Sequence, residues 1–232
     1  MKAIVTCGPS YEPIDRVRRI TNFSSGELGV LLSESLARAG HEVICLKGTA
    51  ATYRDPIDGP VIRHFDTNDD LLRLLQEESQ CGDVDAIFHA AALCDYKVSR
   101  VRDQGGEELN TAKIPSRAGG LSLELEPATK VIRHLRDLFP QAALVGWKYE
   151  LAGSREEAVL RSLNQLREAR SDACVVNGSA FGTGFGFCDS SGLTQEWVGK
   201  GELVDWLTKW LPDHGTHSDA ANSGPVQPPA TI

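Results

Sequence analysis

The chain has 232 residues, of which 41% are hydrophobic and 24% charged, so it can form one folded domain of ordinary composition. The formal net charge is −8 and no basic stripe is present, which argues against non-specific binding to duplex nucleic acid. The first residues lack a signal-peptide pattern and no segment has the length and hydrophobicity of a membrane span. We therefore expect a cytoplasmic protein without a nucleic-acid or membrane partner.

The first part of the chain predicts a βαβ unit. Residues 2–8, KAIVTCG, form an apolar run that a Gly-Pro-Ser turn ends, and residues 26–43 have helical spacing closed by Gly40. Residues 42–48, EVICLKG, predict a second buried strand. Strand, helix and strand in about 45 residues imply two parallel strands joined by a right-handed crossover.

The alternation continues along the chain. Further strands are expected at 61–66, 84–93, 142–147 and 172–178, and helices at 67–80, 127–139 and 154–170. Thr67 or Asn68 is expected to cap one helix, Ser154 caps another, and Pro127 lies in the first turn of the third. The pattern predicts an α/β fold with a Rossmann-like, doubly wound, mostly parallel sheet.

Other segments break this rhythm. Residues 97–120 are polar, basic and Gly-rich, and their length indicates either a functional loop or an extended arm. Residues 177–187 predict a flexible loop, and residues 188–199 a hairpin arm. We expect one domain over 1–211, with a small β-hairpin or arm extension, and a disordered tail over 212–232.

The six cysteines form no C-x-x-C pair, and four of them lie in apolar runs. Reduced thiols in such positions pack as small hydrophobic groups, so we expect structural cysteines without disulfides or zinc. No metal-binding set is predicted from the spacing. His89 and His134 have no Ser or Cys nucleophile placed beside them by spacing, which argues against a hydrolase triad.

The stretch ITNFSSGELG, residues 20–29, supports two interpretations. It lacks the G-x-G-x-x-G and P-loop patterns, but Ser24, Ser25 and Gly26 stand immediately before a predicted helix. Ser24 or Ser25 as N-cap would stabilise that helix by about 1 kcal/mol. A helix N-terminus with two hydroxyls and nearby arginines, such as Arg19, is also a ready anion site. The residues alone leave both interpretations open.

The stretch HAAALCDYK offers a second candidate site. Small residues at 90–92, at the end of a predicted strand, permit close approach of a flat ligand. Asp95 follows, where it could contact a ribose, a base or a metal. The alternative is that Asp95 is simply a turn residue.

These stretches together resemble a known family. TCGPSYEPIDRVRRITNFSSGELG, HAAALCDYKV, AKIPS and LVGWKYEL occur in the order found in the phosphopantothenoylcysteine synthetase (phosphopantothenate–cysteine ligase) family, and the resemblance covers residues 3–210. It implies a dimeric, modified dinucleotide-binding domain. The implied reaction activates 4′-phosphopantothenate with CTP or ATP, assisted by Mg²⁺, and cysteine then displaces the nucleotide from an acyl-nucleotide.

The resemblance also implies site residues. Asn22 matches a residue that contacts the acyl-nucleotide, and Lys113 resembles the first lysine of a K-x-K-K loop that reaches over an active site across the dimer. The implied nucleotide-binding residues are Ser24, Ser25, Gly26, Ala91, Asp95, Trp147, Arg167 and Arg170, the two arginines standing with Gln165 near two family lysines. Arg19 and Asn177 are expected to bind substrate.

The chain departs from the family pattern at several positions. Cys7 and Pro9 replace a Gly and a Thr, EPAT at 126–129 replaces NPDI, and Lys148 and Tyr149 replace alanines. The family's upstream flavin domain is not expected, and so neither is FMN. The departures support an alternative function, a non-ligating member that binds a nucleotide or phosphorylated ligand in a regulatory or reductase-like role. A further alternative is a dimeric interaction protein that binds a partner through residues 97–120.

Overall fold

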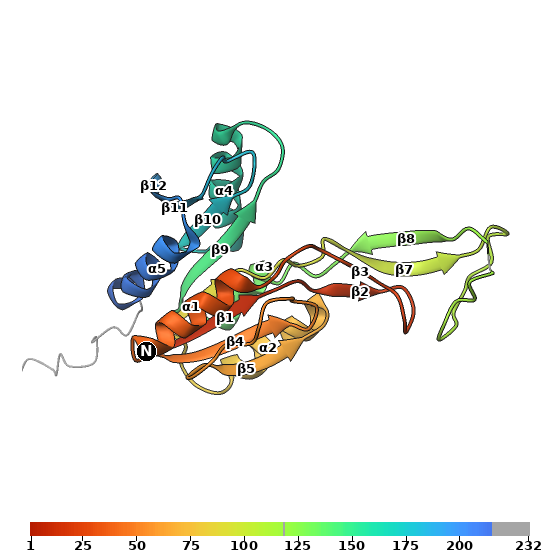
Figure 1. Ribbon diagram of the computed structural model, residues 1–232, viewed down its shortest axis with the longest axis horizontal. Coiled ribbons are helices and arrows are strands. Elements are labelled where there is room, and N and C mark those ends of the chain that lie inside the picture. Colours follow the sequence, from red (N-terminus) through yellow and green to blue (C-terminus); the bar gives the residue numbers. More distant parts are fainter. Residues whose placement is uncertain (118, 215–232) are drawn as a thin grey trace, which may run out of the picture.

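The computed structural model describes residues 1–117 and 119–214, and an α/β fold is built around one large sheet (Figure 1). Within the described residues this sheet has eight strands in the order β12-β11-β10-β9-β6-β1-β4-β5. The strands are β1 (Lys2–Cys7), β4 (Glu42–Gly48), β5 (Val61–Phe65), β6 (Ala86–His89), β9 (Ala143–Tyr149), β10 (Ala173–Asn177), β11 (Phe185–Asp189) and β12 (Gly192–Trp197). All neighbours from β10 to β5 are parallel, and β11 and β12 are antiparallel.

The parallel part of the sheet confirms the predicted Rossmann-like fold. Counted along the chain, its strands lie in the order 3-2-1-4-5-6, the arrangement of doubly wound dinucleotide-binding domains. The chain leaves β1 toward β4 on one side and later returns to β6 on the other side of β1. The carboxyl ends of β1 and β6 therefore form the topological switch point, where ligands bind in open parallel sheets.

Helices cover both faces of the sheet. They are α1 (Glu27–Arg38), α2 (Asn68–Ser79), α3 (Ile132–Leu138), α4 (Arg155–Ala169) and α5 (Lys200–His214). Alternate strand residues serve the two faces: Val5 and Phe88 join the core with α1 and α5, whereas Ile4 and Ile87 join the core with α2 and α3. α4 closes a smaller apolar cluster with Val176. This two-sided burial makes the sheet a rigid support for the loops at its carboxyl edge.

The observed starts of two helices agree with those predicted from the sequence, and the starts of two others differ. Thr67 caps α2 by accepting from the Asp70 N–H, and Ser154 caps α4 in a capping box. At α1, however, the N-cap is Gly26, with φ 78°, rather than Ser24 or Ser25. α3 begins at Ile132 instead of 127, because Pro127 still belongs to β8 and residues 128–131 connect that strand to the helix.

The C-terminal helix α5 was not expected, although its apolar residues recur at helical spacing. It lies against α1 and buries Leu203, Leu207 and Leu211 against the sheet. Trp206 packs on Phe187, with ring centroids 4.6 Å apart, and also contacts Trp197 and Trp210. α5 runs to His214, three residues past the expected domain boundary, and residues 215–232 of the expected tail lie outside the described residues.

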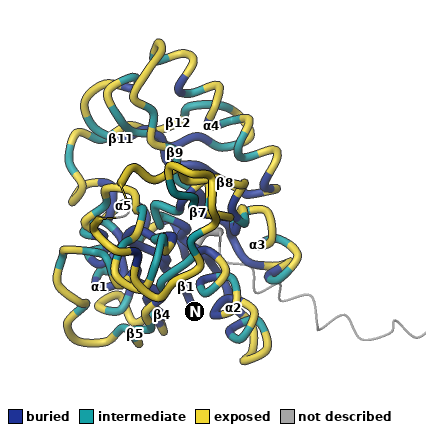
Figure 2. Tube along the Cα trace, turned by 90° about the vertical axis from the view of Figure 1, so that its right-hand side faces the viewer, coloured by how far each residue is buried: buried dark blue, intermediate teal, exposed yellow. Residues whose placement is uncertain are grey.

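Residues 97–120 belong to an arm rather than a simple loop. Strands β7 (Tyr96–Arg102) and β8 (Ser122–Pro127) pair antiparallel and extend away from the main sheet (Figure 1). Every residue of β8 is exposed, in contrast to the buried central strands (Figure 2). Leu123 and Leu125 alternate along this strand and so share one face, and the exposed Leu121 directly precedes the strand. The arm thus presents an apolar stripe that the described residues leave uncovered.

A second short ribbon anchors the connection between the arm strands. Strands β2 (Tyr11–Pro13) and β3 (Arg19–Thr21) pair antiparallel, and Asp15 lies in their turn. The Asp15 carboxylate accepts hydrogen bonds from the backbone N–H groups of Ile114, at 3.1 Å, and Arg18, at 2.7 Å. The bond from Ile114 is the main reason that the Asp15 pKa is lowered. The segment beside Lys113 is thereby tied to the β2–β3 turn.

Candidate functional site

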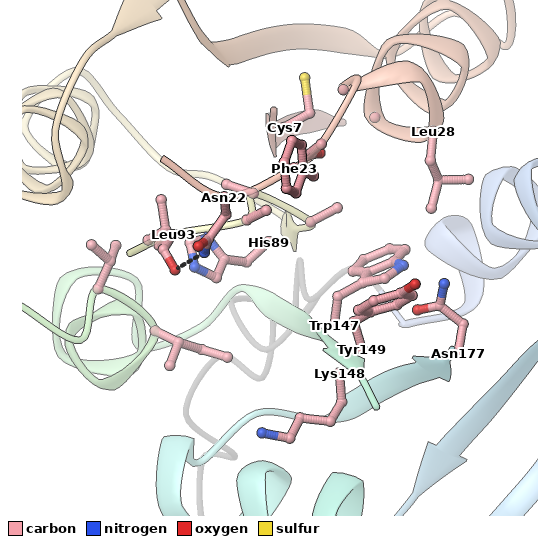
Figure 3. A pocket seen from close by; sticks show the side chains of 18 of the residues that line it. Cys7, Asn22, Phe23, Leu28, His89, Leu93, Trp147, Lys148, Tyr149 and Asn177 are labelled. Carbon is pink, nitrogen blue, oxygen red and sulfur yellow. Dashed lines mark hydrogen bonds between the residues drawn. The ribbon is translucent and has the colours of Figure 1, made fainter. Parts of the chain in front are cut away.

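A cavity of about 770 Å³ lies at the carboxyl ends of β1, β6 and β9, where the fold predicts a ligand (Figure 3). Its wall combines the loop before α1, the loop after β6, the start of α3, the end of β9 and the first residue of α5. The cavity is large enough for a nucleotide-sized ligand. It therefore unites segments that are more than 170 residues apart in the chain.

The loop before α1 forms one wall. Asn22 donates from its side-chain amide to the Leu93 carbonyl at 2.8 Å, which joins this loop to the loop after β6. Ser25 Oγ accepts from the Glu27 N–H at 3.3 Å, so this hydroxyl lies at the start of the helix although it is not the N-cap. A Cβ at Gly29 would lie 2.3 Å from the Cys7 Cβ, and only glycine lets α1 approach β1 so closely. The positive end of the α1 dipole therefore borders the cavity.

The loop after β6 forms the adjoining wall and is held by backbone bonds. Ala92 N–H donates to the Gly8 carbonyl at 2.9 Å, and Cys94 N–H donates to Ser10 Oγ at the same distance. The small side chains of Ala90, Ala91 and Ala92 line the cavity at the switch point. Asp95 at the end of the loop forms an ion pair with Lys130 at the rim of the cavity.

Successive side chains at the end of β9 line different parts of the cavity wall. Trp147 and Tyr149 point to one side of the strand, and Lys148 points to the other (Figure 3). Gln165 of α4 donates to the Trp147 carbonyl at 3.1 Å, so this helix also contributes to the wall. The Trp147 indole N–H and the side-chain amide oxygen Oδ1 of Asn68 are buried without a partner among the described residues. Unsatisfied polar atoms beside a cavity are typical of functional sites.

Three lysines that the sequence argument did not assign line the cavity. Each has a carboxylate partner: Lys130 pairs with Asp95, Lys200 with Glu27, and Lys148 with Glu150 at 3.4 Å. Glu150 also accepts from Arg161 at 2.6 Å and is only 13% exposed. Two cations thus share one carboxylate beside the Lys148 part of the wall. Lys130 and Lys200 lie outside the quoted motifs and Lys148 stands where the family pattern has an alanine, so the sequence assigned none of them to the site.

The structure brings together most of the predicted site residues. The predicted residues that line the cavity are Asn22, Ser24, Ser25, Gly26, Ala91, Asp95, Trp147 and Asn177. Arg19 lies outside it, with its guanidinium 4.6 Å from the Tyr11 ring centre. Lys113 also lies outside, because its segment is tied to the β2–β3 turn.

Arg167 and Arg170 differ from their expected placement. α4 runs antiparallel to the sheet strands, so its last turn lies at the edge opposite the cavity. Arg170 there pairs with Asp137 at 2.6 Å, and Arg167 contacts Asn164. Arg161 lies one turn before Gln165 on the same helix face. Of these four residues, only Gln165 lines the cavity, and Arg161 lies outside it, paired with Glu150.

Two buried thiols, those of Cys7 and Cys94, lie in the wall of the cavity. Cys7 lines the cavity, with its Sγ 3.8 Å from that of Cys45, and this contact and burial raise the pKa of Cys7. All six cysteines are free, and five are buried as expected. The described residues contain no group of three or more His, Cys, Asp or Glu side chains arranged to hold a metal ion. No helix within the described ranges is long and apolar enough to cross a membrane.

Known proteins resemble this chain over most of its length. Coenzyme A biosynthesis bifunctional protein CoaBC of Thermococcus kodakarensis is 32% identical over 184 residues, which cover 78% of this chain and 42% of that protein. The protein of the same name from Bacillus subtilis is 27% identical over 189 residues, covering 79% of this chain and 42% of that protein. The chain therefore spans less than half the length of these relatives.

Solved structures give the same result. The DNA/pantothenate metabolism flavoprotein from Streptococcus pneumoniae is 26% identical and has a TM-score of 0.81, covering 92% of this chain and 99% of that one. The model of the DNA/pantothenate metabolism flavoprotein C-terminal domain matches residues 1–196. The fold, the cavity and these matches confirm the resemblance seen in the motifs: the chain belongs to the DNA/pantothenate metabolism flavoprotein C-terminal domain family.

Proposed function

We propose that this protein is a cytoplasmic, nucleotide-dependent ligase that joins 4′-phosphopantothenate to cysteine. The observation that carries the proposal is the single cavity at the switch point, which unites the Asn22–Gly26 loop with the Ala91–Asp95 loop. Relatives that match more than three quarters of this chain are named as coenzyme A biosynthesis proteins. The cavity also offers the three lysines that an anionic substrate requires.

The proposed reaction has two steps. A carboxylate oxygen of phosphopantothenate attacks the α-phosphorus of CTP or ATP, the bond from that phosphorus to the bridging oxygen breaks, and pyrophosphate leaves. The amine of cysteine then attacks the acyl carbon, loses a proton, and forms the amide as the nucleoside monophosphate leaves. Both steps place negative charge on phosphate oxygens. The protein therefore contributes mainly positioning and charge neutralisation.

The structure supports specific roles in these steps. We assign Asn22 to the acyl phosphate, because its amide lies where the two loops meet. Ser24, Ser25 and the N-terminus of α1 would bind a phosphate through hydroxyl and N–H groups. Lys148, Lys130 and Lys200 would exchange their carboxylate partners for phosphate oxygens. Asn177 would contact the acid or the amine from the Trp147 side of β9.

The nucleotide is proposed to enter as its Mg²⁺ complex, so the metal belongs to the substrate. Mg²⁺ normally keeps several waters and uses substrate phosphates with only one or two carboxylates. The cavity fits this requirement, because it is lined by the carboxylates of Glu27 and Asp95 rather than by a preformed cage. No residue of the site is assigned to FMN.

The arm supports a homodimer as part of the proposal. Leu123 and Leu125 of β8, with Leu121 just before it, expose between 37% and 49% of their surface. A second copy of the chain would cover this stripe in a two-fold arrangement. Lys113 lies between β7 and β8, outside its own cavity, so it would serve the cavity of the partner.

A second candidate function is binding of a nucleotide or phosphorylated ligand without ligation. It is favoured by the placement of Arg167 and Arg170 at the far edge of the sheet, which removes two expected phosphate ligands. A role in regulation or as a reductase-like protein would fit such a site. Both candidate functions use the same cavity, but only the ligase would form the amide product.

One assay separates the two candidates. The purified chain is incubated with 4′-phosphopantothenate, cysteine and Mg²⁺, with CTP or ATP, and pyrophosphate and the amide are measured. Amide and pyrophosphate in equal amounts support the ligase. Nucleotide binding by calorimetry without amide from either nucleotide supports the second candidate. Omission of cysteine is the control, since pyrophosphate should then stop at one equivalent of acyl-nucleotide per site.

A further inference from the structure

A buried polar pair stands at the switch point and has no part in the roles assigned above. Thr6 of β1 and His89 of β6 are register partners in adjacent parallel strands. Thr6 is fully buried and His89 is 6% exposed, yet His89 lines the cavity. Their side chains meet at 2.9 Å, between Thr6 Oγ1 and His89 Nδ1. Figure 3 places His89 on the wall near Asn22 and Leu93.

The surroundings of Thr6 decide which partner donates. The Ala91 N–H approaches Thr6 Oγ1 at 3.4 Å and can only donate to it. The hydrogen of a buried hydroxyl also needs an acceptor. His89 Nδ1 is the one acceptor recorded for it within the described residues. The Thr6 O–H therefore donates to His89 Nδ1, and Nδ1 carries no hydrogen.

The protonation state of the ring follows from its burial. Removal from water disfavours the charged imidazolium and lowers the pKa of His89 to about 4. The ring is therefore neutral near pH 7 and carries one hydrogen. Because Nδ1 accepts from Thr6, that hydrogen resides on Nε2. The lone pair that would make His89 a general base is already used by the threonine.

We propose that Thr6 fixes His89 as the Nε2–H tautomer and that this imidazole donates a hydrogen bond to an acceptor atom of the nucleotide in the cavity. The inference rests on the proposed function only in naming a nucleotide as the ligand. The small residues Ala91 and Ala92, which follow the strand, allow a ligand to approach the ring. A neutral donor offers direction without charge, and so complements the lysines.

The tautomer is tested first, on the full chain without ligand. Nitrogen-15 NMR of the histidine side chains should show His89 with hydrogen on Nε2 and no titration between pH 5.5 and 8. Thr6→Val should shift the ring toward the Nδ1–H form, while Thr6→Ser should keep the Nε2–H form. An Nδ1–H ring in the unchanged protein, or titration near pH 6.5, would overturn the proposal.

Nucleotide binding is tested next, by calorimetry with Mg²⁺ and either CTP or ATP. Thr6→Val should weaken binding of the preferred nucleotide about tenfold, because the ring would then present a lone pair where a hydrogen is needed. Thr6→Ser and His89→Gln, which retain a donor, should stay within about threefold, whereas His89→Met should match Thr6→Val. The Ser and Gln variants keep the test valid if the apolar variants fail to fold.

The outcomes separate this proposal from the ligase itself. If the unchanged protein binds a nucleotide but makes no amide, and Thr6→Val still weakens binding, ligation fails while the role of His89 stands. If Thr6→Val and His89→Met bind the nucleotide as well as the unchanged protein, the role of His89 fails although ligation persists. Binding of neither nucleotide by the unchanged protein would overturn the donor role.

Discussion

Asn22 donates a 2.8 Å hydrogen bond to the carbonyl of Leu93, which lies 71 residues further along the chain. This bond joins the loop before α1 to the loop after β6 at the switch point, where the order of the strands reverses. The Asn22 side chain is exposed to the cavity apart from this contact. It can therefore meet a ligand while its orientation is fixed.

Asn22→Asp should lower turnover in the ligase assay by about 100-fold or more. The carboxylate would lose the donor to Leu93 and place a negative charge beside the acyl phosphate. The melting temperature should change little, because the side chain is exposed. Asn164→Asp, an exposed change on α4 outside the cavity, is the matched control for the added charge. Unaltered turnover in Asn22→Asp would contradict the assignment.

Lys148→Met should raise the KM for the nucleotide about tenfold, because two cations there share only Glu150 and one of them is removed. Lys209→Met, on the exposed face of α5 and outside the cavity, removes the same charge and serves as control. Initial rates at varied CTP and ATP provide the measurement. An equal rise in KM for Lys148→Met and Lys209→Met would show that the net charge of the protein, rather than a contact from Lys148, affects nucleotide binding.

Lys113→Gln should reduce turnover more than substrate affinity, because the lysine is expected at the partner's cavity when the site closes. Mixing provides a stricter test. Homodimers of Lys113→Gln and of Asn22→Asp should each be nearly inactive, and exchange of their subunits should restore about a quarter of the sites. Mixtures that stay inactive after verified subunit exchange would rule out a shared site.

The buried imidazole of His89 should make the protein sensitive to mild acid. Its pKa falls from 6.5 to about 4 on folding, so the folded state binds fewer protons than the unfolded chain between those values. The contribution of the neutral His89 ring to the free energy of unfolding is complete above pH 6.5 and decreases as the pH falls toward 4. It amounts to at most about 3 kcal/mol. Denaturant unfolding from pH 7.5 to 4.5 should therefore show a steeper loss for the unchanged protein than for His89→Gln. If both proteins lost the same free energy of unfolding over this pH range, the proposed link between His89 and acid sensitivity would be wrong.

The parallel sheet could be predicted from sequence because its strands and helices carry local signals. Apolar runs, a Thr67 cap and the Ser154 capping box each act over a few residues. The start of α1 was misassigned because serine and glycine both favour such positions, and only the backbone shows that Gly26 takes the left-handed conformation. β11 begins within the predicted flexible loop, and Gly186 of that loop lies in this strand, which is paired on both sides.

The walls of the site were less predictable than its motifs. The Asn22 and Ala91 loops could be found from continuous stretches of sequence, whereas Lys130, Lys148 and Lys200 come together only through the fold. The placement of Arg167 and Arg170 depended on a helix register that composition does not reveal. A shift of a few residues along α4 carries a side chain from the cavity edge to the opposite edge of the sheet.

The distribution of the four tryptophans gives the protein its own optical probe. Trp197, Trp206 and Trp210 lie packed together around α5, whereas Trp147 alone lines the cavity. A bound base or phosphate would alter the fluorescence emission of Trp147. The emission of Trp197, Trp206 and Trp210 would stay constant and serve as a reference. Occupancy of the cavity can therefore be followed by intrinsic fluorescence, without a label and before any product forms.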